Sequence, residues 1–188
     1  MATNRTFDLR ANPQGYLIPH ENGAALSCAI DPEKQARQWM DKNKHYIQLG
    51  LPVTVLGIGA GLHLQKLHQL TLLPITAVDT RPGLISWARK IFKQTEINFV
   101  LLEEKQSVLT HPLLTGEIGR TLPLIFEPAA GNSLEHFRTS AENLRGRSDE
   151  VWTMKNLDPA KPRHWREWAV TYHDVLHIEQ KILKEVLS

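Results

Sequence analysis

The chain has 188 residues, of which 41% are hydrophobic and 22% charged, a composition typical of a folded globular protein rather than a disordered one. Its formal net charge of +2 is too small to indicate nucleic acid or an anionic membrane as a partner, and its one cysteine excludes an internal disulfide or a cysteine-rich metal cluster. Because the N-terminus lacks a basic segment followed by an apolar one and no apolar stretch approaches ~18 residues, we expect a cytoplasmic protein without a secretory signal or a transmembrane helix.

Turn sequences divide the first thirty residues into short segments. Asn12-Pro-Gln-Gly15 and His20-Glu-Asn-Gly23 separate apolar runs around residues 7–9, 16–18 and 24–30. Strands interrupted so closely predict a small antiparallel β extension over residues 1–30, packed on the main domain.

A helix is predicted to begin at Asp31-Pro32-Glu33. Asp31 can cap the helix, proline is favoured in a first turn, and Glu33 is well placed against the helix dipole. Ala36, Trp39 and Met40 give this helix its buried face.

From Pro52 onward, apolar strands alternate with amphipathic helices. The predicted strands are 53–57, 75–79, 97–102, 122–126 and 150–154, and the predicted helices are 61–71, 83–94, 132–145 and 163–187. Residues 103–121 give no clear element. This alternation predicts a doubly wound α/β domain over residues 31–188, Rossmann-like and mostly parallel, with strand order 3-2-1-4-5. We expect this domain and the extension to form one globular unit.

A glycine-rich turn follows the first of these strands. Gly57, Gly59 and Gly61 lie between the strand and the next helix, and Asp79 ends the following strand 18 residues after Gly61. Glycines let backbone amides approach a ligand, and an acid at this place can accept hydrogen bonds from ribose hydroxyls. A P-loop would need Lys and Ser or Thr after the last glycine, and the NAD fingerprint would need its third glycine one residue later. The Gly-x-Gly-x-Gly spacing favours S-adenosylmethionine; a purely structural turn is the alternative.

The stretch from Ala77 to Lys90 resembles the second strand and helix of class I methyltransferases. The resemblance implies that Asp79 holds the ribose hydroxyls, while Thr80 and Arg81 line the adenosine side. The chain departs from that family elsewhere. It has Val55 where an acid is usual, and after the fourth strand Phe126-Glu-Pro-Ala-Ala130 replaces an Asp/Asn-Pro-Pro-Tyr site. Glu103 and Glu104 lie where an adenine-contacting acid is common. We therefore expect ligand binding rather than methyl transfer, and we assign no catalytic residue.

Two further motifs, residues 29–39 and residues 55–64, occur in the order seen in the N-terminal domain of bacterial motility accessory factors. The resemblance spans residues 10–95 and implies a link to flagellin glycosylation. The large central transferase-like domain of that family is missing, so we expect an accessory domain, either free-standing or part of a larger or split gene.

Two more residues are candidates for ligand contact. His63 begins the helix after the glycine turn, where it could meet a phosphate or carboxylate or else bond the local backbone. Glu127 follows the fourth strand, where it could orient a ligand, act as a base, cap the following turn or face solvent.

The C-terminal region carries weaker signals. His173 and His177 are one helical turn apart and could share a metal, but a solvated pair is the better interpretation. Residues 152–166 mix basic and aromatic side chains as nucleic-acid sites do, yet an exit loop is favoured. We expect a small nucleotide-type ligand, no metal, no nucleic acid and no membrane, with a homodimer or docking to a larger transferase as the assembly. The alternatives are an active S-adenosylmethionine-dependent methyltransferase and a non-catalytic scaffold module.

Overall fold

We describe residues 7–146 of a computed structural model of the chain, which lie in the first of its two units, Met1–Ser148. A small antiparallel sheet comes first, with strands β1 (Phe7–Ala11), β2 (Leu17–Glu21) and β3 (Ala24–Ala25) in that order. The turn between β2 and β3 is Asn22-Gly23, and both residues have positive φ, as a tight hairpin turn requires. The predicted β extension is therefore confirmed, although β3 is shorter than the predicted run 24–30.

Helix α1 (Pro32–Ile47) begins where the sequence predicts. The Asp31 carboxylate accepts a hydrogen bond from the Lys34 amide at 2.8 Å, which satisfies one of the unpaired donors of the first turn. The buried face includes Ala36 and Trp39, with Met40 half-buried beside them. The Trp39 indole donates to the Ile125 carbonyl at 2.9 Å, which ties α1 to the main sheet.

The main sheet has four parallel strands in the order β6-β5-β4-β7. Its elements are β4 (Val53–Leu56), α2 (Leu62–Leu70), β5 (Ile75–Asp79), α3 (Pro82–Ile91), β6 (Ile97–Leu101) and β7 (Leu122–Ile125). In chain order this is 3-2-1-4, as predicted. All four strands carry buried apolar side chains, as expected for a parallel sheet covered by helices. The predicted fifth strand, 150–154, and the predicted helix 163–187 lie outside the described residues.

The connection from β6 to β7 contains turns and one short 3₁₀ helix, η1 (Thr115–Glu117). His111 organises it: one ring nitrogen bonds the Leu101 carbonyl at 3.1 Å, and the other accepts the Leu113 amide at 3.2 Å. After β7 come α4 (Glu127–Ala130), η2 (Gly131–Ser133) and α5 (Leu134–Arg145). The C-cap of α5, Gly146, has φ +75°, a left-handed conformation that glycine adopts without strain.

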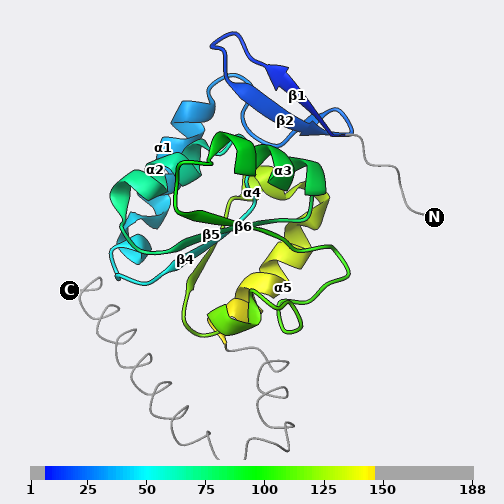
Figure 1. The fold of residues 1–188 in the computed structure, drawn as a ribbon. Helices are drawn as coiled ribbons and strands as arrows, with labels where there is room; N and C mark the ends of the chain where they lie inside the picture. The colour runs from blue at the N-terminus through cyan, green and yellow to red at the C-terminus, as the bar shows by residue number, and fades with distance from the viewer. Residues whose placement is uncertain (1–6, 147–188) are drawn as a thin grey trace, which may run out of the picture. The chain divides into compact units, whose positions relative to one another are not determined.

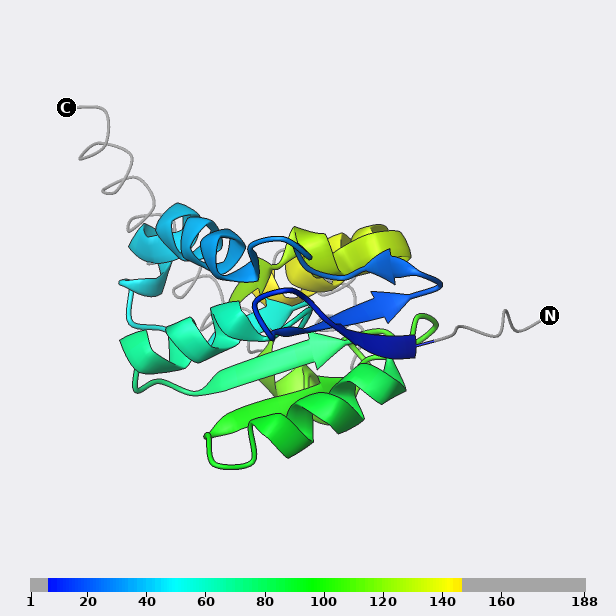
Figure 2. The same ribbon diagram turned by 90° about the horizontal axis from the view of Figure 1, so that it is seen from above.

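The helices and the small sheet surround the parallel sheet (Figures 1 and 2). Helix α1 packs on α2, α3 lies against β5 and β6, and α5 lies against β7. The small sheet lies beyond the carboxyl ends of the parallel strands, over the start of α3, where Phe7 approaches Gly83. No helix within residues 7–146 combines the length and the apolar character that a membrane span requires.

Candidate functional site

The glycine turn after β4 needs glycine at all three positions. Gly57, Gly59 and Gly61 have φ values of +102°, +49° and +78°, in the region that side chains disfavour. They are also packed closely. A Cβ on Gly57 would lie 2.9 Å from the Phe126 carbonyl oxygen, and one on Gly61 would lie 2.7 Å from the Phe92 ring. The close approach that these glycines permit is thus to other parts of this chain.

Asp79 meets the glycine turn, as the sequence predicts, at the end of β5. Its side chain is fully buried. Oδ2 accepts the Ile58 amide at 3.0 Å, and Oδ1 accepts the Arg81 amide at 3.2 Å and Arg81 Nη1 at 2.9 Å. Both carboxylate oxygens therefore already accept hydrogen bonds from the protein.

Arg81 links three parts of the fold around Asp79. Its guanidinium donates to Glu21 Oε2 on β2 at 3.0 Å, and to the Ala129 and Ala130 carbonyls of α4 at 3.0 and 3.3 Å. The side chain is almost completely buried, and its Nε has no hydrogen-bond partner. The two flanking carboxylates compensate the buried cation.

The electrostatics of Asp79 reflect both burial and Arg81. Burial raises the pKa of the Asp79 carboxyl above its ordinary value, because desolvation disfavours the charged form. The Arg81 charge and the hydrogen bonds from Ile58 and Arg81 oppose this rise in pKa. Arg81 is thus what keeps a charged Asp79 tolerable at a buried position.

The segment after β3 covers the glycine turn. Ser27 Oγ accepts the Ala60 amide at 2.8 Å. A Cβ on Gly59 would overlap Ser27 Oγ and would lie 2.7 Å from the Leu26 carbonyl oxygen. The backbone amide that the turn would offer to a ligand at Ala60 is therefore paired with Ser27.

His63 lies inside an aromatic cluster. Its ring stacks on Phe126 with centroids 3.8 Å apart and an interplanar angle of 8°, and Trp39 meets it edge-on at 5.1 Å. Nε2 lies 3.2 Å from the Gly57 carbonyl oxygen, to which it donates. Burial lowers the pKa of His63 to about 3, so the ring is neutral at neutral pH. This geometry corresponds to the local-backbone interpretation of His63.

A second polar cluster joins the ends of β5 and β6 to η2. Thr80 Oγ1 and Ser133 Oγ are 3.0 Å apart, and Ser133 Oγ donates to Glu104 Oε1 at 3.3 Å. Because Ser133 has a single hydroxyl proton, Thr80 is the donor to Ser133. Nearby, burial lowers the pKa of His136 and the Glu104 charge opposes that shift. Glu127 is separate from this cluster and is exposed at the start of α4.

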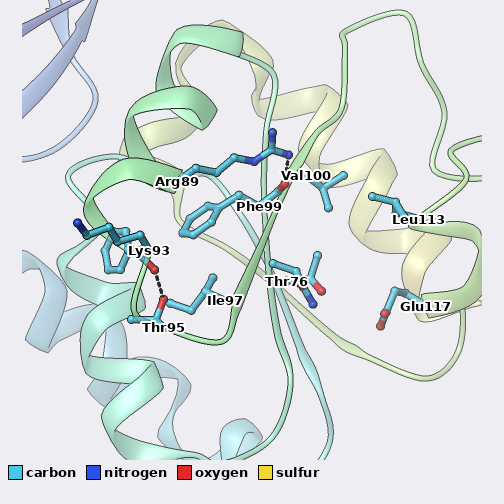
Figure 3. Close-up of a pocket in the computed structure, with 11 residues that line it drawn as sticks. Thr76, Arg89, Lys93, Thr95, Ile97, Phe99, Val100, Leu113 and Glu117 are labelled. Atoms are coloured by element: carbon cyan, nitrogen blue, oxygen red, sulfur yellow. Dashed lines mark hydrogen bonds between the residues drawn. The ribbon is translucent and has the colours of Figure 1, made fainter.

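A groove of about 610 Å³ lies elsewhere, along β6 (Figure 3). Its lining includes Arg89 of α3, Lys93 just after that helix, and Leu113 and Glu117 of the β6–β7 connection. Arg89 Nη2 donates a hydrogen bond to the carbonyl of Phe99 in β6 at 2.6 Å. None of the residues predicted to bind a ligand lines this groove.

The site also contains three residues that the sequence did not indicate: Glu21, Ser27 and Ser133. Each acts through a contact between distant parts of the chain: 60 residues separate Glu21 from Arg81, and 33 separate Ser27 from Ala60. No sequence motif predicts their roles. The one relevant indication is the turn sequence that ends at Gly23, because it predicts that the residues around it form a small sheet.

Other predictions fall outside the described residues, among them the histidine pair His173 and His177 and the basic, aromatic stretch 152–166. Within residues 7–146, no three His, Cys, Asp or Glu side chains gather as a metal site requires. Comparison with protein-family models and with curated proteins finds no match to this sequence.

Proposed function

We propose that the described domain binds a nucleotide-type ligand at the carboxyl ends of β4 and β5, with S-adenosylmethionine as the first candidate. The observation that carries the proposal is the hydrogen bond between Asp79 Oδ2 and the Ile58 amide, at 3.0 Å. It holds the carboxylate of the second strand against the glycine turn of the first. In Rossmann-like domains, the glycine turn and the acid beside it bind the ribose hydroxyls and a negatively charged or polar group of the ligand.

The strand order supports the same location. Open parallel sheets bind ligands beyond the carboxyl ends of their strands, at the point where the strand order reverses. Here β5 and β6 lie on one side of β4 and β7 lies on the other, so the reversal falls between β4 and β7. Gly57 stands at that point, with its backbone closely approaching Phe126.

The role proposed for this ligand-binding domain is that of an accessory domain, in the manner of motility accessory factors and flagellin glycosylation. Its support is that the two motifs behind that resemblance form one packing unit. Trp39 from the Asp-Pro helix meets His63 from the glycine turn edge-on at 5.1 Å, and the His63 ring stacks on Phe126. Motifs that occur in order along the sequence are thus in contact in the fold. A larger transferase is the partner that such a domain would serve.

Methyl transfer is less well supported than binding. Val55 is a buried apolar residue in the place where an acid is usual, and Glu127 is exposed at the start of a short helix. Neither gives a general base held near the glycine turn, so no catalytic residue is proposed.

A second candidate function is a non-catalytic assembly module. The specific observation that favours it is that the chain itself occupies the polar groups of the turn: Asp79 bonds Arg81, and Ala60 bonds Ser27. In that case the glycine turn joins the small sheet to the main domain and binds nothing else.

Calorimetry of the full chain separates the two. S-adenosylmethionine, its demethylated product, a nucleoside triphosphate and a nucleotide-sugar are titrated into the wild type, Asp79→Asn and the matched control Asp41→Asn, whose side chain is exposed on α1. Binding with a stoichiometry of one that weakens roughly tenfold or more in Asp79→Asn alone supports the proposal, since hydrogen bonds to charged groups contribute about 1.5–3 kcal/mol. No binding of any of the four favours the assembly module. Binding without modification of a methyl-acceptor panel leaves a binding domain without transferase activity.

A further inference from the structure

We infer that residues 7–27 form an autoinhibitory cover, which holds the ligand site closed and must move as a unit before a ligand reaches Asp79. This inference rests on the proposed function, because it concerns regulation of the same site. The cover consists of the small sheet and the segment that leads from it to Ser27. It lies over the carboxyl ends of the parallel strands (Figure 2).

Among residues 7–146, polar contacts of Ser27 and Glu21 hold the cover on the main domain. Ser27 Oγ accepts the Ala60 amide at 2.8 Å, in the middle of the glycine turn. Glu21 Oε2 accepts Arg81 Nη2 at 3.0 Å, and both of these side chains are more than nine-tenths buried. The first contact occupies a backbone donor that would face a ligand. The second holds Arg81 in place while its other arm bonds Asp79.

Steric contact closes the site as well. Gly59 is the centre of the turn, and even a single added carbon there would collide with Ser27 and with the Leu26 carbonyl oxygen. A ligand that approached the Gly59 backbone would need the same space. Binding therefore requires that Leu26 and Ser27 withdraw.

The cover is built to move as one piece. Its own backbone bonds are internal: β1 pairs with β2 over five residue pairs, and the Leu26 amide bonds the Pro19 carbonyl at 2.8 Å. On β1, only Phe7 is even partly buried. Opening would thus break the contacts of Glu21 and Ser27 with the main domain, and the packing of Leu26 and Phe7 on its hydrophobic core, while the small sheet stays paired.

Arg81 is the group that opening would release. Its Nε is buried and has no hydrogen-bond partner while the cover is closed. Without Glu21, the guanidinium keeps Asp79 as its remaining carboxylate. One N–H of Nη2 becomes free, while Nη2 keeps its hydrogen bond to the Ala130 carbonyl at 3.3 Å. A ligand with an anionic or hydroxyl group could then accept a hydrogen bond from that N–H, in the place that the Glu21 carboxylate holds in the closed form.

Amide hydrogen exchange of the full chain tests the cover without any ligand. Three amides report on it: Ala60 bonds the cover, Gly57 bonds Val78 within the main domain, and Leu26 bonds Pro19 within the cover. Opening as a unit makes Ala60 exchange at least roughly tenfold faster than both of the others. Exchange of Ala60 at the rate of Gly57 would overturn the inference, because the cover would then leave only on global unfolding.

Two variants weaken the two contacts separately, so the test can still be made if one of them fails to fold. Glu21→Gln removes the charge opposite Arg81, and Ser27→Ala removes the acceptor for Ala60. Glu21→Gln leaves the acceptor of the Ala60 amide in place, so it is expected to accelerate Ala60 exchange by about tenfold through opening alone and to leave Gly57 unchanged. Ser27→Ala should also leave Gly57 unchanged, while Ala60 loses its acceptor directly. The matched controls Glu135→Gln and Ser86→Ala, at exposed positions, should change neither. Equal acceleration of Ala60 and Gly57 in both cover variants contradicts the inference.

A ligand titration then tests inhibition. If S-adenosylmethionine binds the wild type, Glu21→Gln should bind it roughly tenfold more tightly, since a larger fraction of molecules is open. Unchanged affinity would overturn the inhibitory role of the cover. If neither chain binds any of the four candidate ligands, the proposed function fails, whereas the exchange of Ala60 still decides separately whether the cover opens.

Discussion

Arg81 Nη1 lies 2.9 Å from Asp79 Oδ1, so the acid expected to hold a ribose is paired with a cation two residues further along the chain. The exposed fraction of the Asp79 side chain is 0% and that of Arg81 is 5%. A buried ion pair of this kind is costly to break, because removing one partner leaves an uncompensated charge away from water.

Arg81→Leu should therefore be strongly destabilised, by about 3–5 kcal/mol at neutral pH. Burial already raises the pKa of Asp79, and loss of the cation should raise it further. An acid whose pKa is raised in the folded state binds its proton more readily there than in the unfolded chain. The destabilisation that Asp79 causes therefore grows as the pH rises above the unfolded-state pKa of about 3.9. In urea unfolding at pH 4.5 and pH 7.5, the loss of unfolding free energy relative to the wild type should be smaller at the lower pH. The exposed control Arg138→Leu should show little deficit at either, and an Arg81→Leu deficit that is independent of pH would contradict this account.

His63 should make the domain sensitive to acid. Its pKa is lowered from 6.5 to about 3, so between these values the unfolded chain binds a proton that the folded chain does not. The free energy of unfolding should then fall as pH decreases through this window, by up to about 1.4 kcal/mol per pH unit for this group. His63→Gln, which keeps a donor without titrating, should have a shallower slope than the wild type between pH 6 and 4. Identical slopes would show that another group is responsible.

Gly59→Ala should disturb the cover more than a glycine substitution at an open turn. Gly59 and Gly23 both have positive φ, so alanine costs about 1–2 kcal/mol in backbone strain at either position. Only at Gly59 would the new Cβ collide, with Ser27 and Leu26; nothing lies within 4 Å of a Cβ at Gly23. Denaturant unfolding should place Gly59→Ala about 1–3 kcal/mol below Gly23→Ala. Equal stability of the two variants would mean that Leu26 and Ser27 move away from the new Cβ without any loss of unfolding free energy.

Trp39→Phe should reveal how firmly α1 is fixed to the sheet. Phenylalanine keeps an aromatic ring beside His63 but loses the indole donor to the Ile125 carbonyl. An acceptor left without its partner costs about 1–3 kcal/mol. The expected loss can be measured by thermal or urea unfolding, with Trp87→Phe, a half-buried tryptophan on α3, as the comparison. A loss no larger than that of Trp87→Phe would contradict the role assigned to the indole.

The fold could be predicted from the sequence because its signals are local. Apolar runs such as 75–79 and the capping pattern at Asp31 depend on neighbouring residues, and the structure confirms both. The predicted strand order is confirmed over the four described strands. The meeting of Asp79 with the glycine turn follows from the same order, since adjacent parallel strands end at one edge.

The contents of the site could not be predicted in the same way. Arg81 was expected beside an adenosine, whereas its described partners are Asp79, Glu21 and two carbonyls of α4. Glu21 and Ser27 reach the site only after the small sheet folds over the carboxyl ends of the strands. Neither residue type nor spacing encodes such a contact, because it depends on how two sheets dock.

The most direct test of ligand binding at the glycine turn is a titration of the ¹⁵N-labelled full chain with S-adenosylmethionine, followed through backbone amide resonances. We predict saturable shifts at Ile58 and Ala60, whose amides bond Asp79 and Ser27, with small changes at Asn98 beside the β6 groove. A titration that leaves Ile58 and Ala60 unmoved, or shifts only the residues along β6, would contradict the proposal.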